Sequence, residues 1–413
     1  MGCVIVEADF DIVETEPRGE NGIGLIDKTP RCRARGDVRL VRDHHETKAA
    51  ALKSGTSLLD AVDDLNWLAC RNGVRAAIPY VITDEDAVTI KKHRALHQTA
   101  LPSRMLYNAS SFPCKGPTLA EPQFLVIGAS GLIGRRLLRT LAPGRAVGTH
   151  HRHAFPGSVS FDLRMDKVTD LLDRVGQNFS HGVLVGGVVN IDNCARDPTG
   201  SAAANVDGII RVIDGLVARG ITPIFASSDA VYDGSHGMWR EEDATASILA
   251  YGRQKRAVER YLEQSGAPFI ALRIAKVLDH DLGETGVLGP WIKELSGGKL
   301  IRCATDQRFC PVGVDDVVSA MLSLVEARAT GIFNLGGAEP VSRIELLEMT
   351  VATLARSCTI RPIIERCSIR DFAFLEPRPF DLTVSIEKLA ATVAYRPEPL
   401  AALCARAVQK ALA

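Results

Sequence analysis

The sequence predicts an α/β protein built on a doubly wound parallel sheet and preceded by an N-terminal extension. Beyond residue 122, short apolar runs typical of buried strands alternate with longer segments of helical periodicity. A glycine-rich turn joins the first of these strands to the first helix. Residues 110–123 hold three prolines and a glycine, as linkers often do. We therefore expect two parts, residues 1–121 and 122–413, with the second folding on its own.

The extension is expected to be α/β or mainly helical. Apolar residues recur at three- and four-residue spacing over 57–71, which predicts a helix. A short strand is expected over 76–82. A second helix is expected over 83–97, because Thr83 and the acidic residues after it form a typical helix start. No motif in the extension indicates a function.

The second part is expected to contain strands and helices in regular alternation. The expected strands are 123–127, 146–149, 182–189, 223–227 and 268–274, and the expected helices are 134–141, 202–220 and 251–266. Because parallel strands need crossover helices, this order favours one sheet covered on both faces.

Composition excludes several classes of function. Lys plus Arg and Asp plus Glu both number 49, which argues against binding nucleic acid through bulk positive charge. No apolar run approaches the ~18 residues of a membrane span, and the N-terminus does not resemble a secretory signal, so we expect a cytoplasmic protein.

The ten cysteines form no Cys-x-x-Cys pair, which indicates reduced thiols. His44, His45, His93 and His97 lack supporting ligand spacing, so no metal site is expected.

The stretch FLVIGASGLIG, residues 124–134, predicts a dinucleotide site. Gly128 allows a tight turn, Gly131 lets backbone amides approach a pyrophosphate, and Gly134 lets the helix pack on the strand. The loop would contribute these three glycines together with Ser130, Leu132 and Ile133 to the cofactor. The spacing Gly-x-x-Gly-x-x-Gly resembles that of the extended short-chain dehydrogenase/reductase superfamily, which implies a Rossmann-type fold.

The end of the second strand favours NADP(H) over NAD(H), although NAD(H) stays open. NAD-specific loops place a carboxylate about 20 residues after the glycines, where it binds the ribose 2′-hydroxyl. Here the strand leads into a cationic turn with His150 and Arg152, which suits a 2′-phosphate. The superfamily resemblance implies that Asp162 contacts the adenine. It also implies that Gly186 and Gly187 keep small residues beside the cofactor.

Tyr251 and Lys255 form a Tyr-x-x-x-Lys pair, which predicts a proton donor. On a helix, positions i and i+4 share a face, so the ammonium is expected to lower the phenol pKa. A tyrosine of this kind can exchange a proton with a substrate oxygen. The preceding strand ends at Ser227 and Ser228, and a serine hydroxyl there can hold a substrate carbonyl.

These elements together resemble the dTDP-4-dehydrorhamnose reductase (RmlD-like) family over residues 122–413. The matching stretches are SSDAVYDG at 227–234, WREEDA, YGRQK and PVGVDDV at 311–317. The resemblance implies that Ser228, Tyr251 and Lys255 are catalytic, with Tyr251 and Lys255 also contacting the cofactor. Ala230 stands where the reductases have a tyrosine, and Lys276 where they have a tryptophan, so the sugar pocket differs.

The resemblance also implies a smaller C-terminal substrate-binding region, mainly 279–330 and 340–380. Its candidate substrate contacts, with those beside the catalytic serine, are Asp229, Lys276, Trp291, Arg308 and Arg378.

The function implied is the NADPH-dependent reduction of a 4-keto nucleotide sugar in carbohydrate biosynthesis, with a homodimer left open. Hydride would come from the nicotinamide and the proton from Tyr251. Two alternatives remain: a nucleotide-sugar epimerase of the same superfamily, and a non-catalytic NADP-binding subunit like the regulatory subunit of methionine adenosyltransferase. A dehydratase is disfavoured, because Ala230 replaces the glutamate that elimination needs.

Overall fold

The computed structural model describes residues 123–279 and 286–412, together with five short strands of the N-terminal extension. The chain divides into two compact units, residues 1–119 and 120–413. Within the described residues, no helix combines the length and the apolar character that crossing a bilayer requires.

The described part of the extension consists of strands. β1 (Val4–Glu7), β2 (Arg39–Arg42) and β3 (His45–Lys48) form an antiparallel sheet, and β4 (Val81–Ile82) pairs antiparallel with β5 (Val88–Thr89). The expected helix over 83–97 is therefore wrong at β5, where two β-branched residues favour a strand over the helix-start signal before them. The expected helix over 57–71 and the side chains of the four histidines lie outside the described residues.

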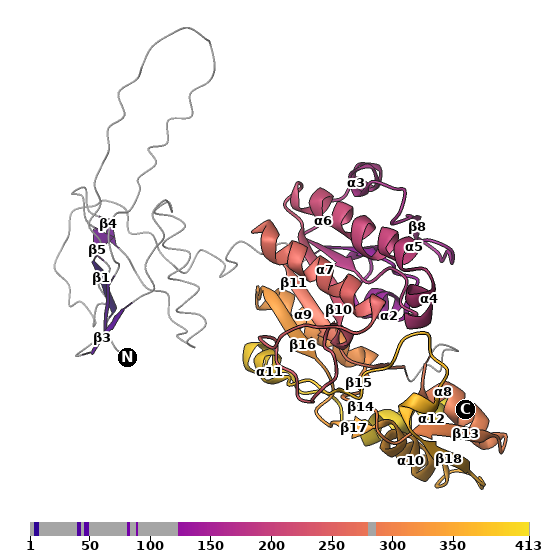
Figure 1. Ribbon diagram of the computed structural model, residues 1–413. Coiled ribbons are helices and arrows are strands. Elements are labelled where there is room, and N and C mark those ends of the chain that lie inside the picture. The colour runs from indigo at the N-terminus through magenta and orange to yellow at the C-terminus, as the bar shows by residue number, and fades with distance from the viewer. Residues whose placement is uncertain are drawn as a thin grey trace. The chain divides into compact units, whose positions relative to one another are not determined.

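A seven-stranded, all-parallel sheet forms the centre of the second unit, which confirms the predicted fold class (Figure 1). In spatial order its strands are β16 (Gly331–Leu335), β11 (Ile270–Ile274), β10 (Thr222–Ser228), β9 (His181–Leu184), β6 (Phe124–Ile127), β7 (Ala146–His150) and β8 (Val159–Ser160). Because β6 lies between β9 and β7, the strand order reverses beside it. Ligands of open α/β sheets bind at such switch points.

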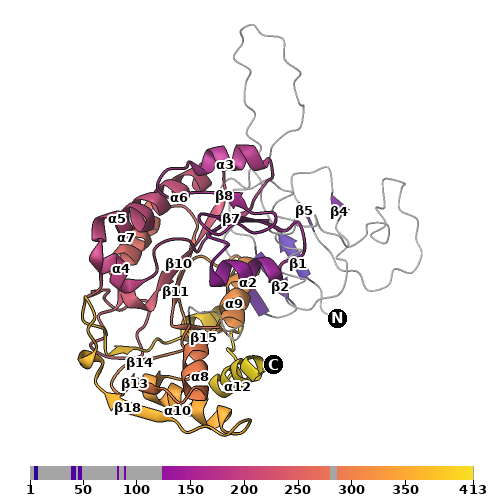
Figure 2. The same cartoon turned by 90° about the vertical axis from the view of Figure 1, so that its right-hand side faces the viewer.

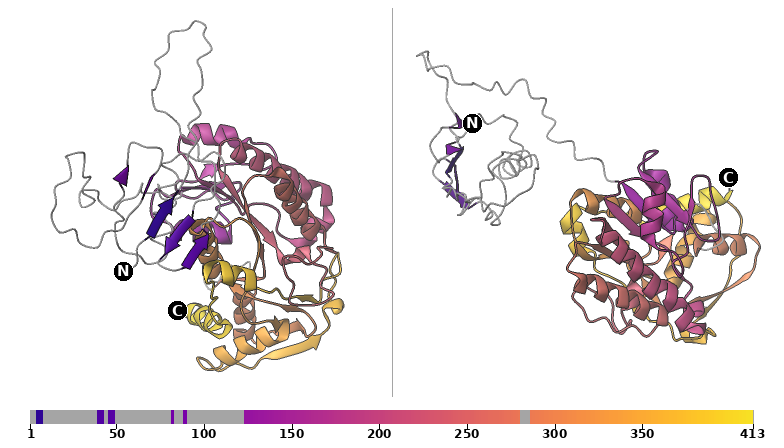
Figure 3. Two further views of the ribbon diagram at one scale, coloured as in Figure 1. Left: turned by 90° about the vertical axis from the view of Figure 1, so that its left-hand side faces the viewer. Right: turned by 90° about the horizontal axis from the view of Figure 1, so that it is seen from above.

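Helices cover both faces of this sheet, as Figures 1 and 3 show from several directions. α2 (Leu132–Thr140), α9 (Val314–Glu326) and α11 (Glu387–Val393) pack on one face, and α3 (Val168–Val175), α6 (Ile209–Val217) and α7 (Ala250–Ser265) on the other. Side chains alternate between the two cores: Phe124 and Val126 enter one, Leu125 and Ile127 the other. A strand buried on both faces therefore reads as a continuous apolar run.

Two expected elements differ in extent. The strand expected over 182–189 ends at Leu184, before the glycine pair. The helix expected over 202–220 begins as a π-helix, η1 (Ala203–Gly208), and continues as α6 to Val217. Two short helices, α4 (Ile191–Arg196) and α5 (Pro198–Ala202), precede it. Short 3₁₀ turns, η2 (Asp229–Val231) and η3 (Ile369–Asp371), follow β10 and β18.

A smaller C-terminal region lies beyond the carboxyl ends of the strands (Figure 2). It has its own core between α8 (Leu288–Ser296), α10 (Arg343–Leu354) and α12 (Leu400–Leu412). Its strand pairs are β12 (Val277–Leu278) with β15 (Val312–Gly313), β13 (Leu300–Ala304) with β18 (Ile363–Cys367), and β14 (Arg308–Phe309) with both β17 (Val341–Ser342) and β19 (Asp381–Leu382). The C-terminal region thus lies at the carboxyl end of the central sheet, the end at which ligands of open α/β sheets bind.

Candidate active site

The glycine-rich turn brings the backbones that follow β6 and β9 into contact. Gly128 has a φ of +88°, and a Cβ there would lie 2.4 Å from the Cα of Gly186. A Cβ on Gly134 would lie 2.6 Å from the Cα of Ala129. Both positions therefore require glycine, the first for its left-handed backbone and both for close approach.

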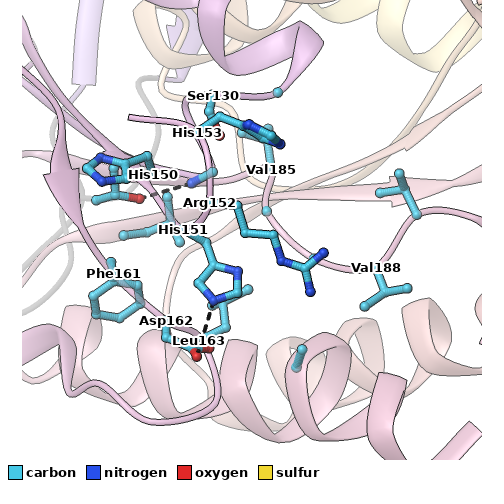
Figure 4. A pocket seen from close by; sticks show the side chains of 18 of the residues that line it. Ser130, His150, His151, Arg152, His153, Phe161, Asp162, Leu163, Val185 and Val188 are labelled. Carbon is cyan, nitrogen blue, oxygen red and sulfur yellow. Dashed lines mark hydrogen bonds and ion pairs between the residues drawn. The ribbon is translucent and has the colours of Figure 1, made fainter. Parts of the chain in front are cut away.

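A cavity of about 500 Å³ opens in front of this turn (Figure 4). Ten of the predicted cofactor residues line it: Gly128, Ser130, Gly131, Leu132, Ile133, His150, Arg152, Asp162, Gly186 and Gly187. Gly134, Tyr251 and Lys255 do not. The first turn of α2 holds no acidic residue and has no side-chain cap. Its free amides and positive dipole end therefore fit the pyrophosphate of a dinucleotide.

The cationic turn forms one edge of the cavity, and its members have different surroundings. His150 Nδ1 lies 2.8 Å from Ser158 Oγ, and His151 Nε2 lies 3.4 Å from the carboxylate of Asp162. Arg152 points into the cavity in Figure 4. Within the described residues no acidic partner occupies its guanidinium. This arrangement leaves Arg152 available to a bound anion.

Ser228, Tyr251 and Lys255 meet at the carboxyl end of β10. The Ser228 hydroxyl donates to Asp229 Oδ1 at 2.9 Å, and it lies near enough to Tyr251 to affect the pKa of that phenol. Lys255 Nζ lies 5.5 Å from the centre of the Tyr251 ring and donates to the carbonyl of Ala226 at 2.7 Å. The i,i+4 spacing thus places the ammonium beside the phenol, as the sequence predicted.

The prediction that Tyr251 has a lowered pKa is wrong for the structure. Burial raises the pKa of Tyr251, and the nearby Asp229 carboxylate raises it further, against the opposing effect of the Ser228 hydroxyl. Burial also lowers the pKa of Lys255 to about 8 and raises that of Asp229 to about 6. Desolvation disfavours the charged form of every one of these groups, and it is the largest cause of the raised pKa of Tyr251.

Asn205 links the cavity wall to the helix that carries Tyr251. Its Oδ1 accepts from the backbone nitrogen of Val188 at 2.7 Å, and its Nδ2 donates to the Val188 carbonyl at 2.9 Å. The same Nδ2 donates to Gln254 Oε1 at 2.8 Å. Val188 lines the cavity, and Gln254 lies between Tyr251 and Lys255 on α7. Asn205 therefore connects the cavity wall at Val188 to Gln254, a residue of the same helix as Tyr251.

The five candidate substrate contacts fall in different places. Lys276 is exposed and interacts electrostatically with the buried Asp229, so these two lie together beside Ser228. Trp291 is buried in the core of the C-terminal region, so packing alone explains a tryptophan at this position. Arg308 is 3.8 Å from Asp381, and Arg378 donates to Asp192 at 2.8 Å.

Sequence reasoning did not assign three residues that shape the site. Thr149 Oγ1 accepts from the backbone nitrogen of Gly128 at 3.1 Å and so fixes the glycine turn. Gln254 is polar and buried next to Lys255. Glu376 contacts the first residue of α7. Gln254 stands inside the Tyr-x-x-x-Lys stretch, but its burial cannot be read from the sequence, and nothing local distinguishes Thr149 or Glu376.

Comparison with known proteins finds relatives of two kinds, a reductase and a subunit of another enzyme. The chain is 26% identical over 249 residues to a probable low-salt glycan biosynthesis reductase of Haloferax volcanii, covering 57% of this chain and 81% of that protein. It is 27% identical over 233 residues to methionine adenosyltransferase 2 subunit beta of Pongo abelii, covering 54% and 69%.

A solved dTDP-4-dehydrorhamnose reductase of Bacillus anthracis str. Ames, in complex with NADP, shares the fold. Its TM-score is 0.60 at 16% identity, and the match covers 69% of this chain and 98% of that one. The family model described as the RmlD substrate binding domain matches residues 123–412, which include the glycine turn, the Ser-Tyr-Lys cluster and the C-terminal region. The chain therefore belongs to the RmlD substrate-binding-domain family.

Proposed function

We propose that this protein is an NADPH-dependent reductase of a 4-keto nucleotide sugar. The observation that carries the proposal is the convergence of Ser228, Tyr251 and Lys255 next to a cavity whose glycine turn fits a dinucleotide. The named reductases among the chain's relatives and structural neighbours support it. NADPH bound in the cavity would supply the hydride that reduces the ketone.

Each of the three side chains has a defined task in this scheme. The Ser228 hydroxyl holds the ketone oxygen of the substrate next to Tyr251. The Tyr251 phenol donates its proton to that oxygen as negative charge develops on it. Lys255 is buried with its Nζ near the Tyr251 ring, and its positive charge stabilises the phenolate left after proton transfer.

The preference for NADPH rests on Arg152. Its guanidinium points into the cavity and has no acidic partner among the described residues, so it can pair with a 2′-phosphate. Asp162, the carboxylate nearest to this edge, already faces His151.

A panel of nucleotide sugars tests the proposal. Each candidate 4-keto sugar is mixed with the protein and NADPH, and the loss of NADPH absorbance is followed, with Tyr251→Phe as the matched variant. We expect oxidation of NADPH with at least one substrate and a fall in turnover of ~10²–10⁴-fold in the variant. A variant that turns over as fast as the wild type would contradict the assignment of Tyr251.

A second candidate function is that of a non-catalytic NADP-binding subunit. It is favoured by the methionine adenosyltransferase 2 subunit beta relatives. In that case the panel yields no oxidation of NADPH although the cofactor binds, and Tyr251→Phe leaves binding to a methionine adenosyltransferase catalytic subunit unchanged.

A further inference from the structure

The helix that carries Tyr251 receives its N-terminal cap from a distant part of the chain. α7 begins at Ala250, one residue before Tyr251, and its own N-cap residue, Leu249, provides no side-chain hydrogen bond. The backbone nitrogen of Ala250 instead donates to both carboxylate oxygens of Glu376, each at 3.0 Å. A residue 126 positions later therefore satisfies the first amide of the helix.

Glu376 also interacts with the second turn of the same helix. Its Oε1 lies 3.2 Å from the Nη2 of Arg253. Only 18% of its side chain is exposed, against 56% for Arg253. A carboxylate at a helix N-terminus also interacts favourably with the macrodipole. The position of this side chain is thus set by two contacts, the bifurcated bond from Ala250 and the ion pair with Arg253.

The segment that carries Glu376 is tied to a second helix of the dinucleotide-binding part. Asp192, in the first turn of α4, accepts from the backbone nitrogen of Leu375 at 3.2 Å and from Arg378 Nη2 at 2.8 Å. The Arg378 guanidinium lies over the Phe374 ring, 4.3 Å from its centre. Residues 374–378 therefore form a strap from the C-terminal region to α4 and α7, the two helices that follow β9 and β10.

We propose that Glu376 is a positioning residue for proton transfer: its carboxylate fixes the first turn of α7 so that the Tyr251 hydroxyl meets the substrate oxygen held by Ser228. This inference rests on the proposed reductase function. The first turn of α7 needs the Glu376 cap, because a helix end without a cap frays. Fraying there would displace Tyr251, and proton transfer requires its hydroxyl at hydrogen-bond distance from the substrate oxygen. The strap would also make the catalytic helix sensitive to the region that binds the substrate.

Three variants separate positioning from general stabilisation. Glu376→Ala removes the cap, and Glu376→Gln keeps an acceptor oxygen. Glu365→Ala is the matched control, because Glu365 is an exposed ion-paired glutamate of the same region, on β18 and bonded to Arg302. We expect Glu376→Ala to lower kcat by about five- to tenfold, as loss of an N-cap suggests, with little change in the KM for NADPH. Glu376→Gln should stay within about twofold of the wild type, and the control should be unchanged.

The Tyr251→Phe background decides whether Glu376 acts through Tyr251. If it does, adding Glu376→Ala to Tyr251→Phe leaves the residual rate unchanged, because the group it positions no longer has a proton to give. An equal fall in rate in both backgrounds would overturn the proposal, as would an unchanged kcat in Glu376→Ala. A Gln variant as slow as the Ala variant would do the same.

Hydrogen exchange provides a readout that needs no turnover. We expect the amides of residues 250–253 to exchange about tenfold faster in Glu376→Ala than in the wild type or Glu376→Gln, and the rest of α7 to be unaffected. If no nucleotide sugar is reduced, the reductase proposal fails but this measurement still tests the cap. Unchanged exchange at these amides would refute the positioning role by itself.

Discussion

Replacing Glu259 by glutamine is expected to destabilise the protein strongly, although the change removes only a charge. Glu259 is fully buried on α7, one turn after Lys255. Its carboxylate accepts from Arg273 Nε at 3.1 Å, from Arg273 Nη2 at 2.9 Å and from Ser227 Oγ at 2.5 Å. Arg273 is itself only 2% exposed. The substitution therefore leaves a guanidinium in the core without a counter-ion.

The expected cost follows from this burial. Removing one partner of a buried ion pair typically costs ~3–5 kcal/mol. For a unit of this size, that corresponds to a fall in Tm of roughly 10 °C. Glu263→Gln is the matched control on the same helix, because its carboxylate is 41% exposed and pairs with Arg256 at 2.8 Å. The control should cost less than about 1 kcal/mol.

Denaturant unfolding followed by circular dichroism measures both variants. If Glu259→Gln costs no more than Glu263→Gln, the buried pair does not carry the stability assigned to it. A double variant, Glu259→Gln with Arg273→Gln, should cost less than the sum of the two single changes. Glu259→Gln alone leaves the Arg273 guanidinium without a counter-ion, and Arg273→Gln alone leaves Glu259 paired only with Arg256, 3.4 Å away. Strict additivity would mean that the two side chains stabilise the fold independently.

Four further outcomes are expected. Titration calorimetry should show tighter binding of NADPH than of NADH, with Arg152→Ser removing a preference of ~10–100-fold; tighter binding of NADH by the wild type would refute the cofactor proposal. Gly128→Ala should abolish cofactor binding, because its Cβ would meet the backbone of Gly186. Asp229→Asn should gain stability relative to the wild type as the pH rises from 4 to 7, by up to ~3 kcal/mol in thermal melts. The reason is that the pKa of Asp229 in the folded protein, about 6, exceeds the ordinary 3.8. Asp229 therefore stabilises the wild type at low pH, and this contribution is lost as the pH rises through about 6. A chain beginning at Met105 should melt cooperatively and bind NADPH; insoluble protein would show that the extension is part of the fold.

The local patterns of the sequence predicted most of the fold and the positions of the candidate site. The glycine turn and the Tyr-x-x-x-Lys pair are contiguous, so their spacing alone determines which backbone or helix face they share. The strand predicted from the apolar run over 182–189 was too long. The observed strand ends at Leu184, and Val188 lines the cavity instead. Apolar side chains therefore continue past the end of the strand, and Val189 is 63% exposed.

Other features of the site depend on contacts between distant segments and left no pattern in the sequence. The Glu376 cap joins residues 126 positions apart, and the Asn205–Gln254 bond joins residues 49 apart. The pKa of Tyr251 moves opposite to the expectation from its neighbour Lys255, because the depth of burial is set by tertiary packing. Charge near a group can be read from spacing, whereas desolvation cannot.

The raised pKa of Tyr251 is compatible with the proton-donor role in the proposed reductase. A reductase needs a phenol that keeps its proton until the ketone oxygen acquires negative charge, and burial keeps Tyr251 protonated across physiological pH. The developing alkoxide is a much stronger base than a phenolate, so the proton still moves downhill. Asp229, which raises the pKa of Tyr251 as it ionises, strengthens this effect of burial as the pH rises through about 6. The electrostatics around Tyr251 thus favour an acid, which is the role that the reductase proposal gives it.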